Sequence, residues 1–187
     1  LVQFGSFAPL DDMYGSTYGY RTSLSGLMIN HMRTKYDKLI NNNILKENSL
    51  ILDIGSNDGT FLNFFASNER NFRLHGIDPS AGKFNNYYNK KINLMVDYFS
   101  EKTVSTFFND NKVIDNKFSL ITSFAMFYDL EDPNAFCKDI RSLLDEDGIW
   151  ISEFSYFPLL LKNLTYDQIC HEHVAYYTLS TFQKIAN

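Results

Sequence analysis

Acidic and glycine residues share one short stretch whose spacing suits a bound nucleoside. Asp53 stands near the end of the apolar run Leu50–Ile54, and the pattern Gly-x-x-x-Gly, from Gly55 to Gly59, follows before an apolar pattern of helical spacing. A strand that ends in a tight glycine turn and a helix start brings backbone N–H groups close to a ligand. The stretch lacks the third glycine of the dinucleotide fingerprint and the Lys-Ser/Thr pair of a phosphate-binding loop. A generic strand-to-helix turn, in which the glycines only close the corner, is the alternative.

Two further carboxylates follow the next strand-like runs of the chain. Asp78 and Pro79 end the second run about twenty residues beyond the glycines, where a carboxylate can accept two hydrogen bonds from a ribose diol. Asp97 and Tyr98 follow the third run. Each acid could instead cap the helix that begins after it. A fourth strand-like run contains Ser123 near its end.

His171-Glu172-His173 is the other stretch whose residue types suit chemistry. Two histidines at i and i+2 point apart on a helix, and no further Cys or His cluster exists, so the sequence predicts no metal site. An imidazole beside a carboxylate can remove a proton next to a carbonyl group, as the formation of a carbon nucleophile requires. Polar residues that cap a surface loop are the alternative.

The elements that must position these residues alternate between strand and helix. Strand-like runs are expected at 50–54, 73–77, 93–96, 118–124 and 149–154, with helical windows at about 59–68, 80–90, 100–109 and 132–144. The alternation predicts an α/β fold, a Rossmann-like sheet of parallel strands with helices on both faces. Residues 145–148 predict a turn before the last strand. Residues 1–20 predict an irregular arm, and a helical pattern covers about 23–41.

Charge and cysteine content exclude several classes of partner. The 187 residues carry a net charge of −5, which argues against nucleic acid or an anionic membrane as the main partner. No apolar run approaches the roughly 20 residues of a membrane span, and no signal peptide is visible. Cys137 and Cys170 form neither a disulfide framework nor a metal-ligand spacing. These features predict a cytoplasmic protein.

In this order along the chain, the Asp53 loop, Asp78, Asp97 and the fourth strand resemble a class I S-adenosylmethionine (SAM) methyltransferase over residues of about 45 to 155. The resemblance implies that SAM lies across the carboxyl ends of the first four strands. It also implies that Asp78 binds the ribose, that Asp97 meets the adenine amino group and that Tyr98 packs on the adenine ring. The candidate cofactor-binding residues are Asp53, Gly55, Ser56, Asn57, Gly59, Phe61, Asp78, Pro79, Asp97, Tyr98 and Ser123.

A closer resemblance, to the nucleotide-sugar C-methyltransferases, rests on three further motifs: Tyr18-Gly19-Tyr20-Arg21-Thr22-Ser23 followed by His31, then His171-Glu172-His173, then Tyr176-Tyr177. This resemblance implies methylation of C3 of a 4-keto deoxysugar, held as a nucleoside diphosphate, through an enolate. The candidate catalytic residues are then His173 as the base, Glu172 as its support, and Tyr18 or Tyr20 in the sugar pocket. Tyr18, Tyr20 and Arg21 are the candidate donors to the enolate oxygen.

The resemblance implies a protein of three parts: an N-terminal zinc-binding module, a central SAM domain and a C-terminal domain of related α/β form. The chain would then be the middle of such a protein, without the other two parts and without the terminal antiparallel strands of a methyltransferase sheet. We expect residues 1–44 to form an arm and a helix that covers the cofactor, and residues 45–187 to form the SAM-binding domain.

The chain departs from the family pattern on the substrate side. The family commonly has Tyr directly before His-Glu-His, where this chain has Cys170, and His after the fourth strand, where it has Asp129. The prediction is a SAM-dependent methyltransferase with a small-molecule substrate, most simply a nucleoside-diphosphate sugar. Methylation of oxygen or nitrogen in another small metabolite, and a non-catalytic SAM-binding module, are the alternatives.

Overall fold

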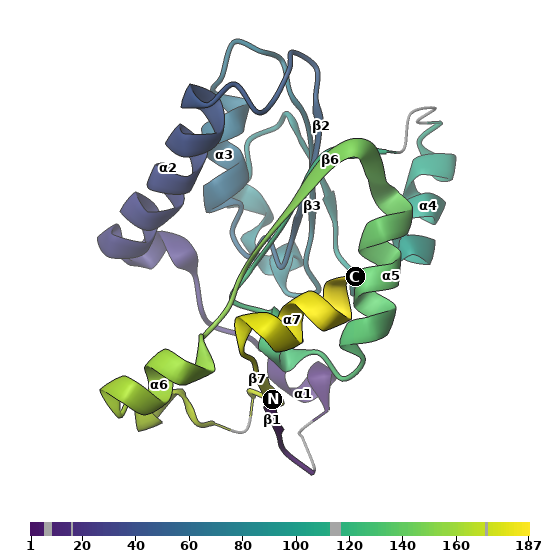
Figure 1. The fold of residues 1–187 in the computed structure, drawn as a ribbon. Coiled ribbons are helices and arrows are strands. Elements are labelled where there is room, and N and C mark those ends of the chain that lie inside the picture. Colours follow the sequence, from purple (N-terminus) through teal and green to yellow (C-terminus); the bar gives the residue numbers. More distant parts are fainter. Residues whose placement is uncertain (6–8, 16, 113–116, 171) are drawn as a thin grey trace.

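Five parallel strands form the central sheet of the computed structural model, which describes residues 1–5, 9–15, 17–112, 117–170 and 172–187. The strands lie in the order β4-β3-β2-β5-β6 (Figure 1), and their bounds are β2 Leu50–Ile54, β3 Arg73–Ile77, β4 Ile92–Met95, β5 Phe118–Phe124 and β6 Leu144–Glu153. This arrangement confirms the predicted Rossmann-like fold. The chain order reverses between β2 and β5, and ligands of such sheets bind beyond the carboxyl ends of the strands at that point.

Helices cover both faces of the sheet (Figure 1). Side chains of α2 (Gly26–Asn41) and α3 (Thr60–Ala66) pack with Ile51 and Leu74 on one face. Side chains of α4 (Glu101–Asp110), α5 (Pro133–Leu143) and α7 (Leu179–Ala186) pack with Leu52 on the other. All five residues of β2 are buried, which is why this strand is a continuous apolar run rather than an alternating one.

The sequence-based bounds match the structure closely where a strand is buried on both faces. The first, second and fourth predicted strands agree residue for residue with β2, β3 and β5, and the third begins one residue earlier than predicted. The helical window at 80–90 is different, because Ala81–Tyr87 forms a 3₁₀ helix. Gly82, Asn85 and Asn86 lie in this segment, and these residue types have low α-helix propensity.

The turn predicted at residues 145–148 is wrong, because these residues lie within β6. Phe118 pairs with Leu144 and Leu120 pairs with Ile149, so the register shifts and the strand bulges between these pairs. A Cβ atom on Gly148 would lie 2.6 Å from the carbonyl oxygen of Phe118. The glycine therefore permits a close backbone approach, where the sequence pattern had indicated a loop.

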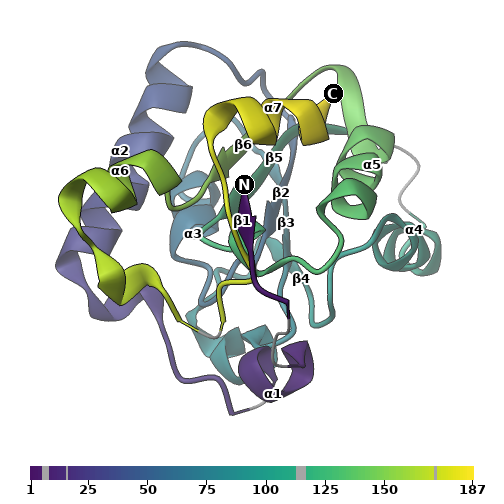
Figure 2. The same ribbon diagram turned by 60° about the horizontal axis from the view of Figure 1, so that its bottom comes forward.

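The first twenty residues are also more regular than predicted. β1 (Val2–Gln3) pairs antiparallel with β7 (Ala175–Tyr176), and α1 (Leu10–Tyr14) follows it (Figure 2). A two-residue strand whose partner is far along the chain leaves no periodic signal. The pairing carries the arm to the same end of the molecule as the segment that contains Glu172 and His173.

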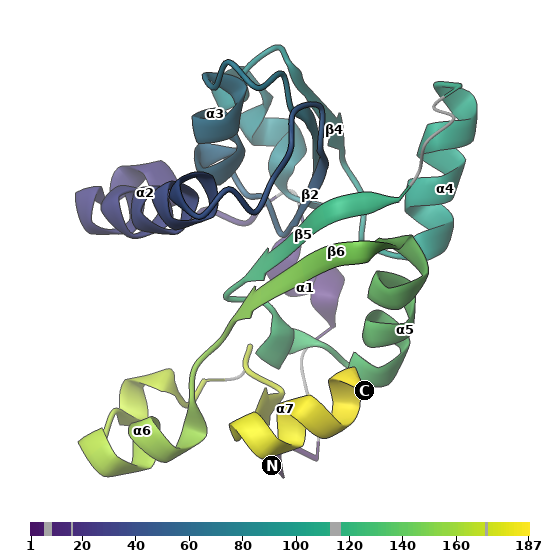
Figure 3. The same cartoon turned by 45° about the horizontal axis from the view of Figure 1, so that its top comes forward.

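Beyond β6 the chain forms α6 (Phe157–Asn163), which stands apart from α4 and α5 (Figure 3). Among the described residues, no helix has both the length and the apolar character that a membrane crossing requires. A single bridge between Tyr156 and Tyr177 joins the start of this segment to the residues after β7.

Phe127 is the centre of an aromatic cluster under the loop that follows β5. It is fully buried, and its ring centroid lies 5.0 Å from that of Phe182, 5.1 Å from that of Tyr177 and 5.9 Å from that of Phe136. These rings come from α7, the segment after β7 and α5. Phe127 therefore connects α5, the segment after β7 and α7, two positions before Asp129 in the chain.

Replacing Phe127 by Ala is expected to lower the free energy of unfolding by about 3–5 kcal/mol, because the cavity left by the ring cannot close within an aromatic cluster. Urea unfolding measures this change. Leu27→Ala is the control: Leu27 is 82 % exposed on α2, so its removal should change stability by less than about 0.5 kcal/mol. A loss below about 1 kcal/mol in the Phe127 variant would contradict the role of this cluster.

Candidate functional site

The turn between β2 and α3 has a left-handed backbone at three positions. The φ angle is +69° at Gly55, +51° at Asn57 and +73° at Gly59. The Gly55 N–H donates to the carbonyl of Ile77 at 2.9 Å, which ties the turn to the end of β3. A Cβ on Gly59 would lie 2.6 Å from the Tyr88 ring, so glycine is needed there for space as well as for φ. The turn is thus a defined backbone cradle.

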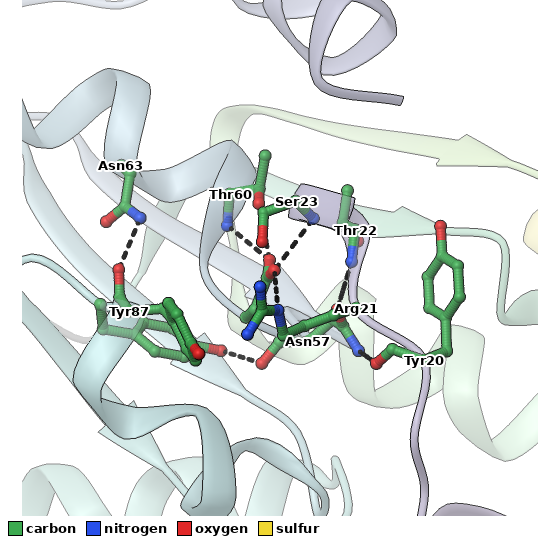
Figure 4. Close-up of polar contacts among 10 residues, drawn as sticks. Tyr20, Arg21, Thr22, Ser23, Asn57, Thr60, Asn63 and Tyr87 are labelled. Atoms are coloured by element: carbon green, nitrogen blue, oxygen red, sulfur yellow. Dashed lines mark hydrogen bonds and ion pairs between the residues drawn. The ribbon is translucent and has the colours of Figure 1, made fainter. Parts of the chain in front are cut away.

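Two side chains of this turn, those of Asn57 and Asp58, form hydrogen bonds with the backbone of the N-terminal arm (Figure 4). Asn57 accepts from the Thr22 N–H at 2.9 Å and donates to the Tyr20 carbonyl at 3.0 Å. The carboxylate of Asp58 accepts from the Ser23 N–H at 3.0 Å. The motif residues that the sequence analysis assigned to a cofactor loop therefore also hold the segment that begins the covering helix.

A cavity of about 300 Å³ opens at the carboxyl ends of β2, β3 and β5, against the arm and α2. It is where the fold places the ligand site of such a sheet. Ten of the predicted site residues line it: Tyr18, Tyr20, Asp53, Gly55, Ser56, Asn57, Phe61, Asp78, Pro79 and Tyr98. The structure thus brings residues from both predicted constellations, the cofactor loop and the sugar pocket, to one cavity.

The chemistry of the cavity wall fits a sulfonium nucleoside. The described residues that line it include three aspartates, Asp53, Asp78 and Asp129, and no Lys, Arg or His. Acidic groups without basic ones favour a ligand that carries positive charge. Apolar side chains, among them Met32 and Phe124, form the rest of the wall and suit an aromatic base and a thioether chain.

Asp78 is buried at the end of β3 and already holds three hydrogen bonds. One oxygen accepts from the Asn57 N–H at 2.9 Å, and the other accepts from the N–H and hydroxyl of Ser80 at 2.7 and 2.6 Å. An ionised carboxylate has about four acceptor positions. One remains for a ligand, and the rotatable Ser80 hydroxyl can release a second. The capping interpretation and the ribose interpretation of Asp78 are thus compatible.

Asp53 lies at the end of β2 below the turn. Its carboxyl accepts from the Thr122 hydroxyl of β5 at 2.6 Å. Burial raises the pKa of Asp53 to about 7, the Thr122 hydrogen bond acts in the opposite direction, and Asp78 adds to the rise. Because a nearby positive charge would favour the ionised form, a cationic ligand in the cavity would be bound more tightly by this acid.

The remaining predicted cofactor residues lie outside the cavity lining. Asp97 is exposed and accepts from the Tyr98 N–H at 2.7 Å, while Tyr98 itself lines the cavity. The hydroxyl of Ser123 is buried and accepts from the indole of Trp150 at 3.0 Å. Gly59 supports the turn from its far end. The contacts that these residues make with a cofactor stay predictions.

The side of the cavity that the sequence analysis predicts to face the substrate is lined by tyrosines of the arm and by an acid after β5. The Tyr14 hydroxyl donates to Asp129 at 2.8 Å, and the Tyr14 and Tyr18 rings meet edge to face at 5.2 Å. Burial raises the pKa of Tyr18 to about 12, with smaller effects from Asp78, Asp129 and Glu172. Tyr20 is 47 % exposed, so it stands at the mouth of the cavity rather than within it.

Neither predicted catalytic residue of the C-terminal segment, Glu172 or His173, is among the described residues that line the cavity. His173 lies next to Tyr128, the chain neighbour of Asp129, with its ring in a defined orientation. Its Nδ1 lies 2.8 Å from the Gln168 carbonyl, and its ring centroid lies 4.1 Å from that of Tyr128. A carbonyl only accepts hydrogen bonds, so Nδ1 carries a proton and Nε2 of the neutral ring is the basic nitrogen. The thiol of Cys170 donates to Glu172 at 3.7 Å. His171, the first member of the motif, lies outside the described residues.

A second hollow, of about 400 Å³, adjoins Tyr128 and Ala125. It contains an ion cluster in which Lys35 Nζ lies 2.7 Å and His31 Nε2 lies 2.9 Å from Glu153 Oε2. Burial acts to raise the pKa of Glu153, but the Lys35 and His31 contacts outweigh it and lower the pKa overall. Among the described residues, no group of three or more His, Cys, Asp or Glu side chains gathers as metal ligands would.

The sequence analysis did not single out several residues that line the cavity. Met28 and Met32 lie one helical turn apart on α2, and their i, i+4 spacing on the predicted covering helix could have indicated them. Tyr14 had no such signal, because it lies in an arm without periodicity. The link between His31 and Glu153 joins residues 122 positions apart and depends on the tertiary fold alone.

Comparison with known proteins gives one family match and one curated relative. The sequence family described as a methyltransferase domain matches residues 28–187. The C-methyltransferase NovU of Streptomyces niveus is 26 % identical over 171 residues, which are 91 % of this chain and 39 % of that protein. The chain thus spans well under half the length of this relative.

Solved structures share the fold at lower identity. The plantazolicin methyltransferase BpumL, solved with a desmethyl plantazolicin analogue and S-adenosylhomocysteine (SAH), superposes with a TM-score of 0.56 at 19 % identity, over 83 % of this chain and 67 % of that one. The YcgJ protein of Bacillus subtilis superposes with a TM-score of 0.58 at 17 % identity, over 83 % of this chain and 66 % of that one. At this identity the likeness concerns the fold.

Replacing Asn57 by Ala is expected to release the arm from the glycine turn, because three hydrogen bonds to Tyr20 and Thr22 are lost. Amide hydrogen exchange at Thr22 and Ser23 should become faster by at least about tenfold, the equivalent of about 1.4 kcal/mol.

Asn63→Ala is the matched control. Asn63 accepts from the Asn89 N–H on the outer side of α3, so its loss should speed exchange at Asn89 and leave Thr22 unchanged. Unchanged exchange at Thr22 in the Asn57 variant would show that the arm is held by other contacts.

Proposed function

The chain belongs to the methyltransferase domain family, and we propose that it methylates a carbon atom, C3, of a nucleotide-linked 4-keto deoxysugar through an enolate. The chain is a SAM-dependent methyltransferase. Its acceptor, the position of methylation and the activity of the whole protein belong to the proposal. The name of the relative NovU, a C-methyltransferase, supports a carbon acceptor.

The residues around the cavity would hold the cofactor by the contacts that the strand ends provide. When bound, SAM supplies an electrophilic methyl group on its sulfonium. Asp78 would accept from the ribose, Tyr98 would pack on the adenine, and the turn from Gly55 would approach the ligand with its backbone. Met28 and Met32 of α2 close the cavity from above the sheet and would exclude water from the reacting groups.

The contact between His173 Nδ1 and the Gln168 carbonyl is the observation that carries the proposed reaction. With Nδ1–H donated to this carbonyl, Nε2 is the nitrogen that would take a proton from an acceptor. Methylation of an oxygen or nitrogen has less need of such a base. Methylation of a carbon next to a carbonyl requires it, because the C–H proton must leave before the carbon can act as a nucleophile.

Glu172 and the tyrosines of the arm would hold the acceptor. The negative charge of Glu172 acts to raise the pKa of Tyr14, Tyr18 and Asp129. The segment that contains His173 is therefore close enough to these cavity residues for their charges to interact. Tyr18 and Tyr20 would contact the sugar. These groups supply the alignment that brings the reacting carbon to the methyl group.

Replacing His173 by Ala is expected to lower kcat for carbon methylation by about 10²–10⁴-fold, the contribution typical of a general base. The protein is incubated with labelled SAM and a panel of 4-keto nucleotide sugars, and NMR spectroscopy locates the label in the product. In deuterated water without SAM, the wild type should exchange the proton on C3 and the variant should not.

Gln183→Ala, at an exposed position of α7, is the control and should retain wild-type turnover. Full turnover in the His173 variant, or a label bound to oxygen or nitrogen, would replace the proposal by methylation of a heteroatom. A wild type that binds neither SAM nor SAH in calorimetry would contradict methyl transfer itself.

A further inference from the structure

A buried carboxyl group of the cavity wall has one oxygen without a partner. Asp129 ends the 3₁₀ helix Phe127–Asp129 that follows β5, and it is 5 % exposed. Its Oδ2 accepts from the Tyr14 hydroxyl at 2.8 Å. Its Oδ1 is buried and has no hydrogen-bond partner among the described residues. Asp129 lines the same cavity as Gly55 and Met126, so a buried carboxyl oxygen without a partner lies in the wall of this cavity.

An ionised carboxylate is costly in this position. A buried charge is tolerated only when it is paired and fully hydrogen-bonded, and half of this group is not. Among the described residues, the titratable groups that interact electrostatically with Asp129 are Tyr14 and Tyr18 from the arm, Tyr128 from its own loop, and Glu172 and Tyr176 from the C-terminal segment. None of these is a cation, and Glu172 carries like charge. The neutral acid is therefore the form that this environment favours.

The pKa of Asp129 is consistent with this geometry. Burial raises it to about 8, the Tyr14 hydrogen bond acts to lower it, and the charge of Glu172 raises it further. At neutral pH the group thus carries a proton. While Tyr14 donates to Oδ2, Oδ1 is the oxygen that can carry the proton of the neutral acid. A neutral carboxylic acid is a hydrogen-bond donor as well as an acceptor.

The proposed reaction needs such a donor, because an enolate develops negative charge on the carbonyl oxygen. Of the three donors that the sequence suggested, Arg21 is engaged outside the cavity lining: its Nε lies 3.7 Å from Asp58 Oδ2, and its guanidinium stacks on the Tyr87 ring at 4.0 Å. Tyr20 lines the cavity only at its mouth. Donors in a site that excludes water stabilise such charge without reorganisation.

We propose that the Asp129 carboxylic acid, held in place by Tyr14, donates its Oδ1 proton in a hydrogen bond to the carbonyl oxygen of a ketone acceptor and stabilises the enolate that His173 generates. This role rests on the proposed function. The C–H proton passes to Nε2 of His173, the electron pair of that bond forms the C=C bond of the enolate, and the π pair of the carbonyl moves onto its oxygen. When the carbon then bonds to the methyl group, the bond between this group and the cofactor sulfur would break with its electron pair left on the sulfur, which gives SAH. The carbonyl re-forms and the Asp129 proton stays on the acid.

Two variants distinguish the role of Asp129 as a hydrogen-bond donor from the effect of its ionisation. Asp129→Asn keeps an N–H donor of similar shape that does not titrate, and Asp129→Ala removes the donor. The Ala variant should lose about 10²–10³-fold in kcat, as enzymes do when one oxyanion donor is removed. The Asn variant should recover part of this loss. Wild-type kcat should fall as pH rises through about 8, and the Asn variant should lack this decline.

Stability provides a readout that is independent of activity. The pKa of Asp129 is higher in the folded protein than the value of about 4 that is usual for aspartic acid, so ionisation favours unfolding. The wild type should therefore lose stability relative to Asp129→Asn as pH rises from about 4 to about 8. The difference between the infrared spectra of the wild type and of Asp129→Asn at neutral pH should contain a protonated carboxyl band, because the contribution of Asp53 is common to both proteins. Asp132→Asn is the control, because Asp132 is an exposed helix cap three positions away.

The experiment combines kcat against pH, exchange of the acceptor C–H in deuterated water, and calorimetric affinities for SAM and SAH. The proposal expects slower exchange in Asp129→Ala, with both affinities within about threefold of the wild type. Unchanged kcat and exchange in this variant would overturn it. So would an Asn variant that loses affinity for SAM but not for SAH, since Asp129 would then be an ionised partner of the sulfonium. A wild type without carbon methylation would instead count against the proposed function, while the infrared band still reports on the acid.

Discussion

The left-handed turn between β2 and α3 is the constraint on which the rest of the site depends. Its backbone is tied to the end of β3 through Ile77 and Asp78, and its side chains Asn57 and Asp58 hold the arm. A turn with φ near +70° at both ends costs little only when those ends are glycine. The turn that the two glycines permit thus holds the end of the arm, immediately before α2.

Charge in the cavity depends on burial. Three aspartates line a cavity whose described wall has no basic side chain, and burial raises the pKa of Asp53 to about 7 and of Asp129 to about 8. Burial thus shifts both acids toward the neutral form. Near the turn, a positively charged cofactor would return Asp53 to its ionised form, whereas Asp129, beside Glu172, stays neutral. One low-dielectric pocket can thus bind a cation and donate a proton at different places.

The sequence predicted the sheet well and its margins poorly, for physical reasons. β2 is buried on both faces, so Leu50–Ile54 is a mainly apolar run between turn residues. Its bounds can therefore be predicted from the sequence. The bulge in β6 is different, because Asp145 and Gly148 have the local chemistry of a turn and only the pairing with Phe118 keeps them in a strand. β1 is two residues long and its partner β7 lies at the other end of the chain.

The sequence by itself determined the fold class and the glycine turn, because both arise from neighbours along the chain: apolar periodicity, strand ends and residues that tolerate positive φ. Tertiary structure alone decided the substrate side. The pair formed by Tyr14 and Asp129 spans 115 positions, and the neutral state of the acid depends on burial and on Glu172. No local pattern can encode such a pair, because the pKa of a carboxyl group depends on what surrounds it in space. The glycine turn was therefore predictable from the sequence, whereas the proposed proton donor to the acceptor, Asp129, could be identified only from the folded chain.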